Sequence, residues 1–154
     1  MSMEGHCSCS RVRYRVGAKP IITHCCHCSW CQRETGSAFA VNAVVETSEI
    51  DIVFGEPETI VTPSASGKGQ KIVRCAHCRV ALWSHYAGAG EALSFLRVGT
   101  LDDPDLCPPD VHIFTSTKRQ WVRLPEDARV FEEFYNPAEV WSDEARARWK
   151  AAKG

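Results

Sequence analysis

The chain has 154 residues, of which 44% are hydrophobic and 24% are charged, and this composition excludes a disordered chain and favours one soluble globular domain. The 18 Lys and Arg residues nearly balance the 19 Asp and Glu residues, which leaves a formal net charge of −1 at pH 7. Nucleic-acid binding draws most of its affinity from an excess of positive charge, so no nucleic-acid partner is expected.

Most of the predicted elements are strands, in which apolar and polar residues alternate. Residues 11–16 alternate strictly and put Val12, Tyr14 and Val16 on one face. Further strands are predicted, in chain order, over residues 39–45, 50–54, 59–62, 70–74, 81–86, 93–98 and 111–115. The sequence Gly55-Glu56-Pro57 interrupts the pattern and predicts a hairpin between residues 50–54 and 59–62.

The C-terminal residues have a different pattern. Trp141, Ala145 and Trp149 recur at helical spacing, and Asn136 or Ser142 could be the N-cap. We therefore predict a mainly β protein, with an antiparallel β domain over residues 1–135 and a short helical tail of the same domain over residues 136–154.

No targeting segment is visible in the sequence. The N-terminal residues contain no apolar stretch like that of an export signal, and the longest apolar runs are four residues, where a membrane span needs about 20. We therefore expect a cytoplasmic protein without a membrane partner. Disulfides seldom persist in a reducing compartment, so the nine cysteines indicate metal binding instead.

The cysteines are grouped along the chain. There is an N-terminal pair, Cys7 and Cys9; a central group, Cys25, Cys26, Cys28 and Cys31; a C-x2-C pair, Cys75 and Cys78; and a lone Cys107. A C-x2-C turn presents two thiolates to one zinc ion, and an extended C-x-C segment does the same. Two buried core cysteines that bind no metal would give the same C-x-C pattern. Cys26, Cys28 and Cys31 could bring three sulfurs together on one loop.

The number of these ligands predicts two zinc ions per chain. Seven cysteines suit one closed four-cysteine site and one three-cysteine site with an open position, as catalytic zinc has. Cys25, His24 or His27 could instead supply an eighth ligand and close the second site. Spacing favours the N-terminal pair as the partner of the C-x2-C pair, since 43 residues separate Cys31 from Cys75 and zinc ribbons have about 15–20.

Three motifs follow one another along the chain. They are Gly5-His-Cys7-Ser-Cys9 with Val12-Arg13-Tyr14, then Cys26-His-Cys28-Ser-Trp-Cys31-Gln-Arg33 with Gly36-Ser37, then Cys75-Ala-His-Cys78. In this order they resemble the motifs of the glutathione-dependent formaldehyde-activating enzyme family, whose domain centromere protein V shares. The resemblance covers about residues 5–135.

The resemblance implies a zinc-bound β-tent fold of antiparallel sheets. Carried over residue by residue, it implies that Cys7, Cys9, Cys75 and Cys78 hold a structural zinc and that Cys26, Cys28 and Cys31 hold a catalytic zinc. The implied activity is that of a carbon–sulfur lyase, which condenses glutathione or a similar thiol with formaldehyde or another small aldehyde.

Several positions depart from the family pattern or extend it. Ser10 and Arg79 stand where glycine is usual, and glycine there would permit a positive φ. Gln32 stands where a basic residue is frequent, which leaves Arg33 as the nearby positive charge. Residues of the same segment could form the substrate pocket. Trp30 could be a wall of this pocket or could merely pack over the metal site, and the amides of Gly36 and Ser37 could bind an anion.

Other readings of the same residues stay open. His27 would point away from the metal if Cys26 and Cys28 face it. His112 could accept a proton near the site or be a structural histidine. Cys25 and Cys107 could be small buried apolar residues. A rival function is a non-catalytic two-zinc module for protein interaction, and a third is thiol–disulfide exchange at Cys28 and Cys31. Four protein ligands at both ions would favour the module, whereas an open coordination position would favour the enzyme.

Overall fold

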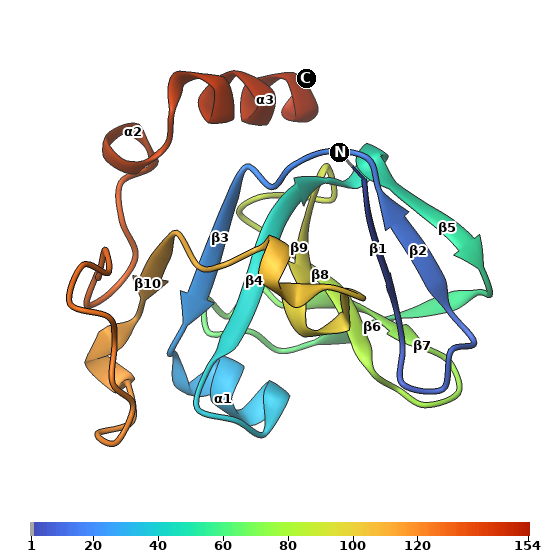
Figure 1. Ribbon diagram of the computed structural model, residues 1–154, viewed down its shortest axis with the longest axis horizontal. Coiled ribbons are helices and arrows are strands. Elements are labelled where there is room, and N and C mark those ends of the chain that lie inside the picture. The colour runs from blue at the N-terminus through green and yellow to red at the C-terminus, as the bar shows by residue number, and fades with distance from the viewer. Residues whose placement is uncertain (1) are drawn as a thin grey trace.

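The computed structural model describes residues 2–154, and in these residues ten strands form two sheets (Figure 1). The smaller sheet has the order β1-β2-β5, with β1 over Met3–His6, β2 over Arg13–Val16 and β5 over Ile50–Phe54. The larger sheet has the order β10-β3-β4-β9-β8-β7-β6. Its strands are β3 Ile22–Cys26, β4 Ala40–Glu46, β6 Pro57–Thr62, β7 Gln70–Cys75, β8 Ala81–Tyr86, β9 Leu93–Arg97 and β10 Val111–Ile113.

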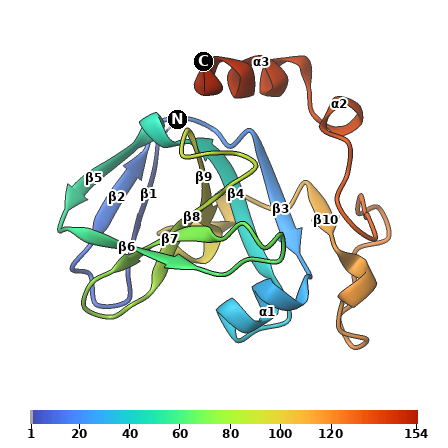
Figure 2. The same cartoon turned by 180° about the vertical axis from the view of Figure 1, so that it is seen from behind.

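Helices are few and short. The α-helices are α1 over Ser29–Thr35, α2 over Pro137–Val140 and α3 over Asp143–Lys153, and the 3-10 turns are Thr47–Glu49, Val98–Thr100, Pro104–Leu106 and Thr115–Thr117. The prediction of a mainly β fold is therefore confirmed. Figures 1 and 2 show the smaller sheet at one side of the molecule, β10 at the other, and α1 below β3 and β4. No helix of the described residues has the length and apolar character needed to cross a membrane.

Apolar side chains lie on both faces of the larger sheet. On one face, Ala43 and Val45 of β4 share a core with Tyr14 of the smaller sheet, whose ring meets Trp83 edge-to-face at 5.8 Å. On the other face, Val44 belongs to a second core that includes Trp141 of the C-terminal segment. The predicted inward face of β2 is confirmed, because Val12, Tyr14 and Val16 are all buried.

Two predicted details of the sheets are wrong. Residues 50–54 and 59–62 do not form a hairpin: β5 pairs with β2 and β6 pairs with β7, in different sheets. The chain passes from one sheet to the other at Gly55, where φ is 85° and a Cβ atom would lie 1.8 Å from the carbonyl oxygen of Arg11. The domain is also not wholly antiparallel, because β10 pairs with β3 in parallel.

The C-terminal helical pattern divides into two helices, and each uses one of the two N-caps that the sequence offers. Asn136 Oδ1 accepts from the amide of Ala138 at the start of α2, and Ser142 Oγ accepts from the amide of Ala145 at the start of α3. The longer helix α3 is tied to the larger sheet by the ion pair of Arg148 with Glu46, at 2.6 Å.

Candidate metal centres

Four cysteines from two separate turns converge between the sheets. The N-terminal pair follows β1, Cys75 ends β7, and Cys78 lies in the turn to β8. The Sγ atoms of Cys7 and Cys9 are 3.6 Å apart, as are those of Cys9 and Cys75, and all four sulfurs lie within 4.8 Å of one another. A tetrahedral ion with Zn–S bonds of about 2.3 Å needs sulfurs about 3.8 Å apart. The four-cysteine group therefore fits one zinc ion.

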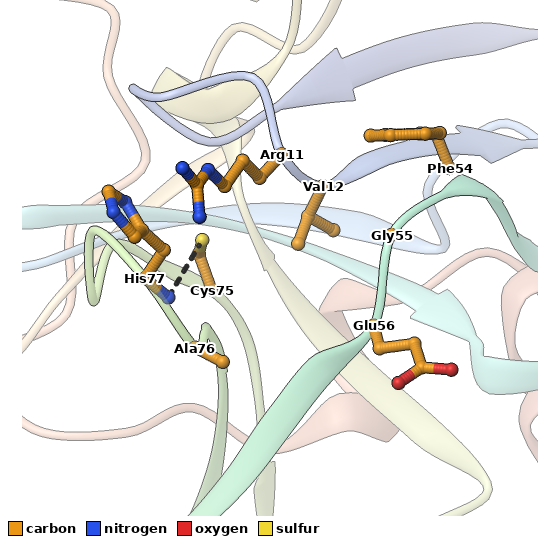
Figure 3. A pocket seen from close by; sticks show the side chains of 8 residues that line it. All are labelled: Arg11, Val12, Phe54, Gly55, Glu56, Cys75, Ala76 and His77. Carbon is orange, nitrogen blue, oxygen red and sulfur yellow. Dashed lines mark hydrogen bonds between the residues drawn. The ribbon is translucent and has the colours of Figure 1, made fainter.

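Backbone amides stabilise the thiolates that a metal requires. The amide of Val12 donates to Cys7 Sγ at 3.4 Å, and the amide of His77 donates to Cys75 Sγ at 3.4 Å, the bond drawn in Figure 3. Burial raises the pKa of Cys75, but hydrogen bonds from the amides of Cys78 and His77 and from the neighbouring cysteine side chains together outweigh it, so this pKa lies below its ordinary value. Hydrogen bonds to the charged form of a thiol favour that form.

Both turns of the four-cysteine group contain a residue in the left-handed region. Ser10 has φ of 59° and Arg79 has φ of 66°, at the two positions where the family pattern has glycine. The amide of Ser10 donates to the carbonyl of Cys7, and that of Arg79 to the carbonyl of Cys75, each at 3.0 Å. These bonds close the turns at the cost of backbone strain, which residues with a Cβ atom experience there.

Ser10→Gly is expected to raise the free energy of unfolding by about 1 kcal/mol, because glycine adopts this φ without strain. Urea denaturation of the metal-replete protein measures the change. Ser8→Gly is the matched control: Ser8 is an exposed turn residue outside the positive-φ positions, so the same substitution there should not stabilise. A Ser10→Gly protein no more stable than the wild type would contradict the strain argument.

A second cysteine group lies at the other face of the larger sheet. Cys26 ends β3, Cys28 is the N-cap of α1, and Cys31 lies within α1, so the predicted loop contains a helix. The three sulfurs lie within 4.8 Å of one another, and Cys28 Sγ accepts the amide of Cys31 at 3.3 Å. This three-cysteine group packs against the second core.

The three sulfurs influence one another's ionisation strongly. Hydrogen bonds from Cys26 and Cys31, helped by the amides of Cys31 and Trp30, lower the pKa of Cys28 to about 2. The same contacts with Cys28 and Cys31 raise the pKa of Cys26. The three thiols therefore share protons and do not ionise independently. A metal ion replaces such protons and lets all three sulfurs ionise together.

None of the three candidates for an eighth ligand joins the three-cysteine group in the described residues. His24 Nε2 forms a 2.5 Å hydrogen bond with the hydroxyl of Tyr135. Cys25 and His27 point away from Cys26, as alternation along a strand requires, and form another cluster with His112. Sequence reasoning missed this cluster because the parallel pairing of β10 with β3 brings His112 beside Cys25. Three protein ligands leave room for one more on a tetrahedral ion.

A pocket rich in arginine adjoins α1. Its volume is about 430 Å³, and it is lined by Glu34 and Thr35 of α1 and by Arg74, Arg79 and Arg97, among other residues. Arg97, which lines the pocket, lies near enough for its charge to act on the Cys31 sulfur, so the pocket is near the three-cysteine group. No motif in the sequence indicated this pocket, because its arginines come from three segments.

The three arginines of this pocket differ in their partners. Arg74 forms an ion pair with Glu34, and Arg79 forms one with Glu58. Arg97 is only 8% exposed, donates to Asn42 Oδ1 at 2.5 Å and to Ser84 Oγ at 3.0 Å, and has no carboxylate partner in the described part of the chain. Its positive charge favours the thiolate of Cys31, so the three-cysteine group is its nearest partner of opposite charge, and an anion in the pocket would add a second.

The residues predicted for the substrate pocket lie on α1 and the turn after it. Trp30 is 42% exposed, and Arg33, Gly36 and Ser37 are also exposed. Their neighbours on the same helix, rather than these four, line the 430 Å³ pocket. Gln32 donates to the carbonyls of His27 at 2.7 Å and Thr117 at 3.0 Å, so it ties α1 to the segment after β10.

Another pocket, of about 590 Å³, lies beside the four-cysteine group (Figure 3). Cys75 and His77 form one side of it, and Phe54, Gly55 and Glu56 lie at the far end. Four sulfurs fill the coordination sphere of a tetrahedral ion, so no substrate could bind a metal from this side. The arginine-rich pocket is therefore the better candidate for a substrate.

A family model and two curated relatives agree on one family. Residues 2–117 match the family model described as glutathione-dependent formaldehyde-activating enzyme. A protein of Halomonas elongata, provisionally named as such an enzyme, is 27% identical over 160 residues, which cover 100% of this chain and 98% of the relative. A similarly named protein of Talaromyces marneffei is 21% identical over 148 residues, 95% of this chain and 71% of its own. A crystal structure from Rhodobacter sphaeroides is 20% identical and covers 70% of this chain and 97% of that chain with a TM-score of 0.49.

Proposed function

This chain belongs to the glutathione-dependent formaldehyde-activating enzyme family, and we propose that it condenses a small acidic thiol, such as glutathione, with formaldehyde or another small aldehyde. The observation that carries the proposal is a three-cysteine group, with no fourth protein ligand in the described residues, next to an arginine-rich pocket. The proposed condensation of a thiol with an aldehyde is the chemistry of a carbon–sulfur lyase.

The donor set suits two zinc ions, one in each cysteine group. Cys7, Cys9, Cys75 and Cys78 would hold the structural ion, and Cys26, Cys28 and Cys31 the catalytic one. When bound at an open site, zinc acts as a Lewis acid that lowers the pKa of a thiol and fixes its position.

The residues of the chain itself would bind and orient the substrates. Arg97 has no carboxylate partner in the described residues and lines the pocket next to Cys31, so it suits a carboxylate of the thiol substrate. Arg74 and Arg79 at the same pocket can exchange their present partners for further carboxylate oxygens. This arrangement would hold the sulfur of the thiol toward the three-cysteine group, where orientation lowers the barrier to addition.

The reaction needs no oxidant or reductant. The sulfur forms a bond with the carbonyl carbon of the aldehyde, the C=O π bond breaks, and the proton lost from the thiol ends on the resulting hydroxyl. Four protein ligands at both ions would favour the non-catalytic module, and a group of three cysteines does not. Thiol–disulfide exchange would need Cys28 and Cys31 but leaves Cys26 without a role.

The experiment compares thiols in zinc-loaded protein. Formaldehyde consumption is expected with glutathione, and glutathione diethyl ester, which lacks the carboxylates, should show a KM about tenfold higher or more, as charge-assisted hydrogen bonds of about 1.5–3 kcal/mol are lost. Equal KM values would remove the acidic-substrate proposal. No turnover with any thiol and aldehyde pair tested would remove the enzyme proposal in favour of the module.

A further inference from the structure

A third set of ligand atoms lies behind the three-cysteine group. Successive side chains of β3 point to opposite faces of the sheet, so Cys25 faces away from Cys26, and His27, just beyond the end of β3, lies with Cys25 rather than with the three-cysteine group. Because β10 runs parallel to β3 with His112 opposite Cys25, a second histidine joins them from 85 residues away. Figure 1 shows β10 beside β3 at the edge of the larger sheet.

The distances within this cluster are close to those of a metal site, and the two nitrogens would need to move apart by a few tenths of an ångström. Cys25 Sγ lies 3.5 Å from His27 Nε2, and His27 Nε2 lies 3.0 Å from His112 Nδ1. All three atoms are within 4.8 Å of one another. Tetrahedral zinc with Zn–S of about 2.3 Å and Zn–N of about 2.0–2.1 Å needs sulfur and nitrogen about 3.5 Å apart and two nitrogens about 3.3 Å apart.

Hydrogen bonding alone leaves this cluster unsatisfied. Cys25 is 2% exposed and His27 is 0% exposed, so neither can turn to water. His27 Nε2 faces both Cys25 Sγ and His112 Nδ1, but it carries either one proton or one lone pair. Its other ring nitrogen, Nδ1, is buried without a partner among the described residues, and an ion at Nε2 would not change that, so only the double contact at Nε2 favours an ion. A cation at the centre would instead use one lone pair from each of the three atoms.

We propose that Cys25, His27 and His112 form a third metal site, which takes a divalent ion of zinc-like preference. One thiolate and two imidazoles are ligands that such ions favour. Lys118 lies near enough for its positive charge to act on His27, and the thiolate of Cys25 would offset it. His112 is only partly buried, so a water molecule can complete the coordination. The ion would fasten β10 to β3.

Cadmium NMR of the full chain loaded with cadmium tests this, because each bound ion gives its own resonance. The wild type should give three resonances, one of them coupled to imidazole nitrogens of His27 and His112, and His112→Gln should lose that resonance alone. His85→Gln is the matched control, since His85 bonds to the carbonyl of Leu93 at 2.9 Å on another strand and should leave all three.

Two wild-type resonances at saturating cadmium, or an unchanged set in His112→Gln, would overturn the third site. If His112→Gln does not fold, the coupling in the wild type decides, and a spectrum without cadmium–imidazole coupling rejects the proposal. The test is independent of the proposed enzyme function, because the three-cysteine group has its own resonance and turnover is measured separately.

Discussion

Cys75→Ser is expected to lose the native fold at ordinary temperature. Cys75 is 1% exposed, and its sulfur lies 3.6 Å from that of Cys9, which is 66 residues away. The four-cysteine group thus connects a turn of the smaller sheet to a turn of the larger one. Structural zinc contributes about 10–16 kcal/mol, as much as the whole stability of a domain of about 5–15 kcal/mol. Losing one of four thiolates should therefore remove both the ion and cooperative folding.

Circular dichroism, thermal unfolding and zinc content measure this effect together. Cys107→Ser is the matched control, because Cys107 is equally buried but contacts Met3 Sδ at 3.4 Å and belongs to no ligand cluster of the described residues. It should keep its metal and lose only about 1–3 kcal/mol, the usual cost of burying an unsatisfied hydroxyl. A Cys75→Ser protein with unchanged metal content and thermal stability would refute the pairing with Cys7 and Cys9.

Cys28→Ser should abolish thiol-dependent formaldehyde consumption, by at least about a hundredfold, while the protein stays folded. The three-cysteine group spans only residues 26–31, so its ion closes a short loop and adds little to stability. Cys28 is also the N-cap of α1, and serine is a favourable N-cap that can accept the same amide of Cys31. The substitution therefore removes a ligand and preserves the start of the helix.

Activity, zinc content and thermal stability of Cys28→Ser should be measured beside Cys75→Ser, with Cys107→Ser as the active control. Retained folding with one zinc ion lost and no turnover is the expected result. Unfolding as complete as that of Cys75→Ser would mean that both ions are structural, and the interaction module would then replace the enzyme.

Alternation predicted most strands but not their partners. The inward face of β2 follows from Val12, Tyr14 and Val16, which are separated by exposed or half-exposed arginines. The same local pattern at β5 and β6 led to the wrong hairpin. Alternation of apolar and polar residues predicts which face of a strand is buried, but it does not predict which strand pairs with it. The arginine-rich pocket was unpredictable for a related reason, because pairing of distant strands assembles it.

The segment around the central cysteines was the least visible in the sequence. All five residues of β3 are buried, so no polar face marks it as a strand. The seven residues of α1 include none that is buried, so no apolar stripe marks it as a helix. The helix is capped by Cys28 at its start and tied by Gln32 to the carbonyls of His27 and Thr117, and the contact with Thr117 exists only in the folded protein.

The burial of β3 on both faces has a consequence for its register. A shift of one residue along β4 would exchange the two faces of the strand and turn Cys25 and His27 toward the side that Cys26 and Cys28 now occupy. Since both faces are covered by protein, apolar contacts distinguish poorly between the correct alignment and the shifted one. If the three-cysteine group binds zinc as proposed, the ligand atoms would distinguish them well, because the shifted strand would present an imidazole in place of a thiolate. A single-residue insertion or deletion within Ile22–Cys26 would thus weaken metal coordination more than it would weaken the packing of the core.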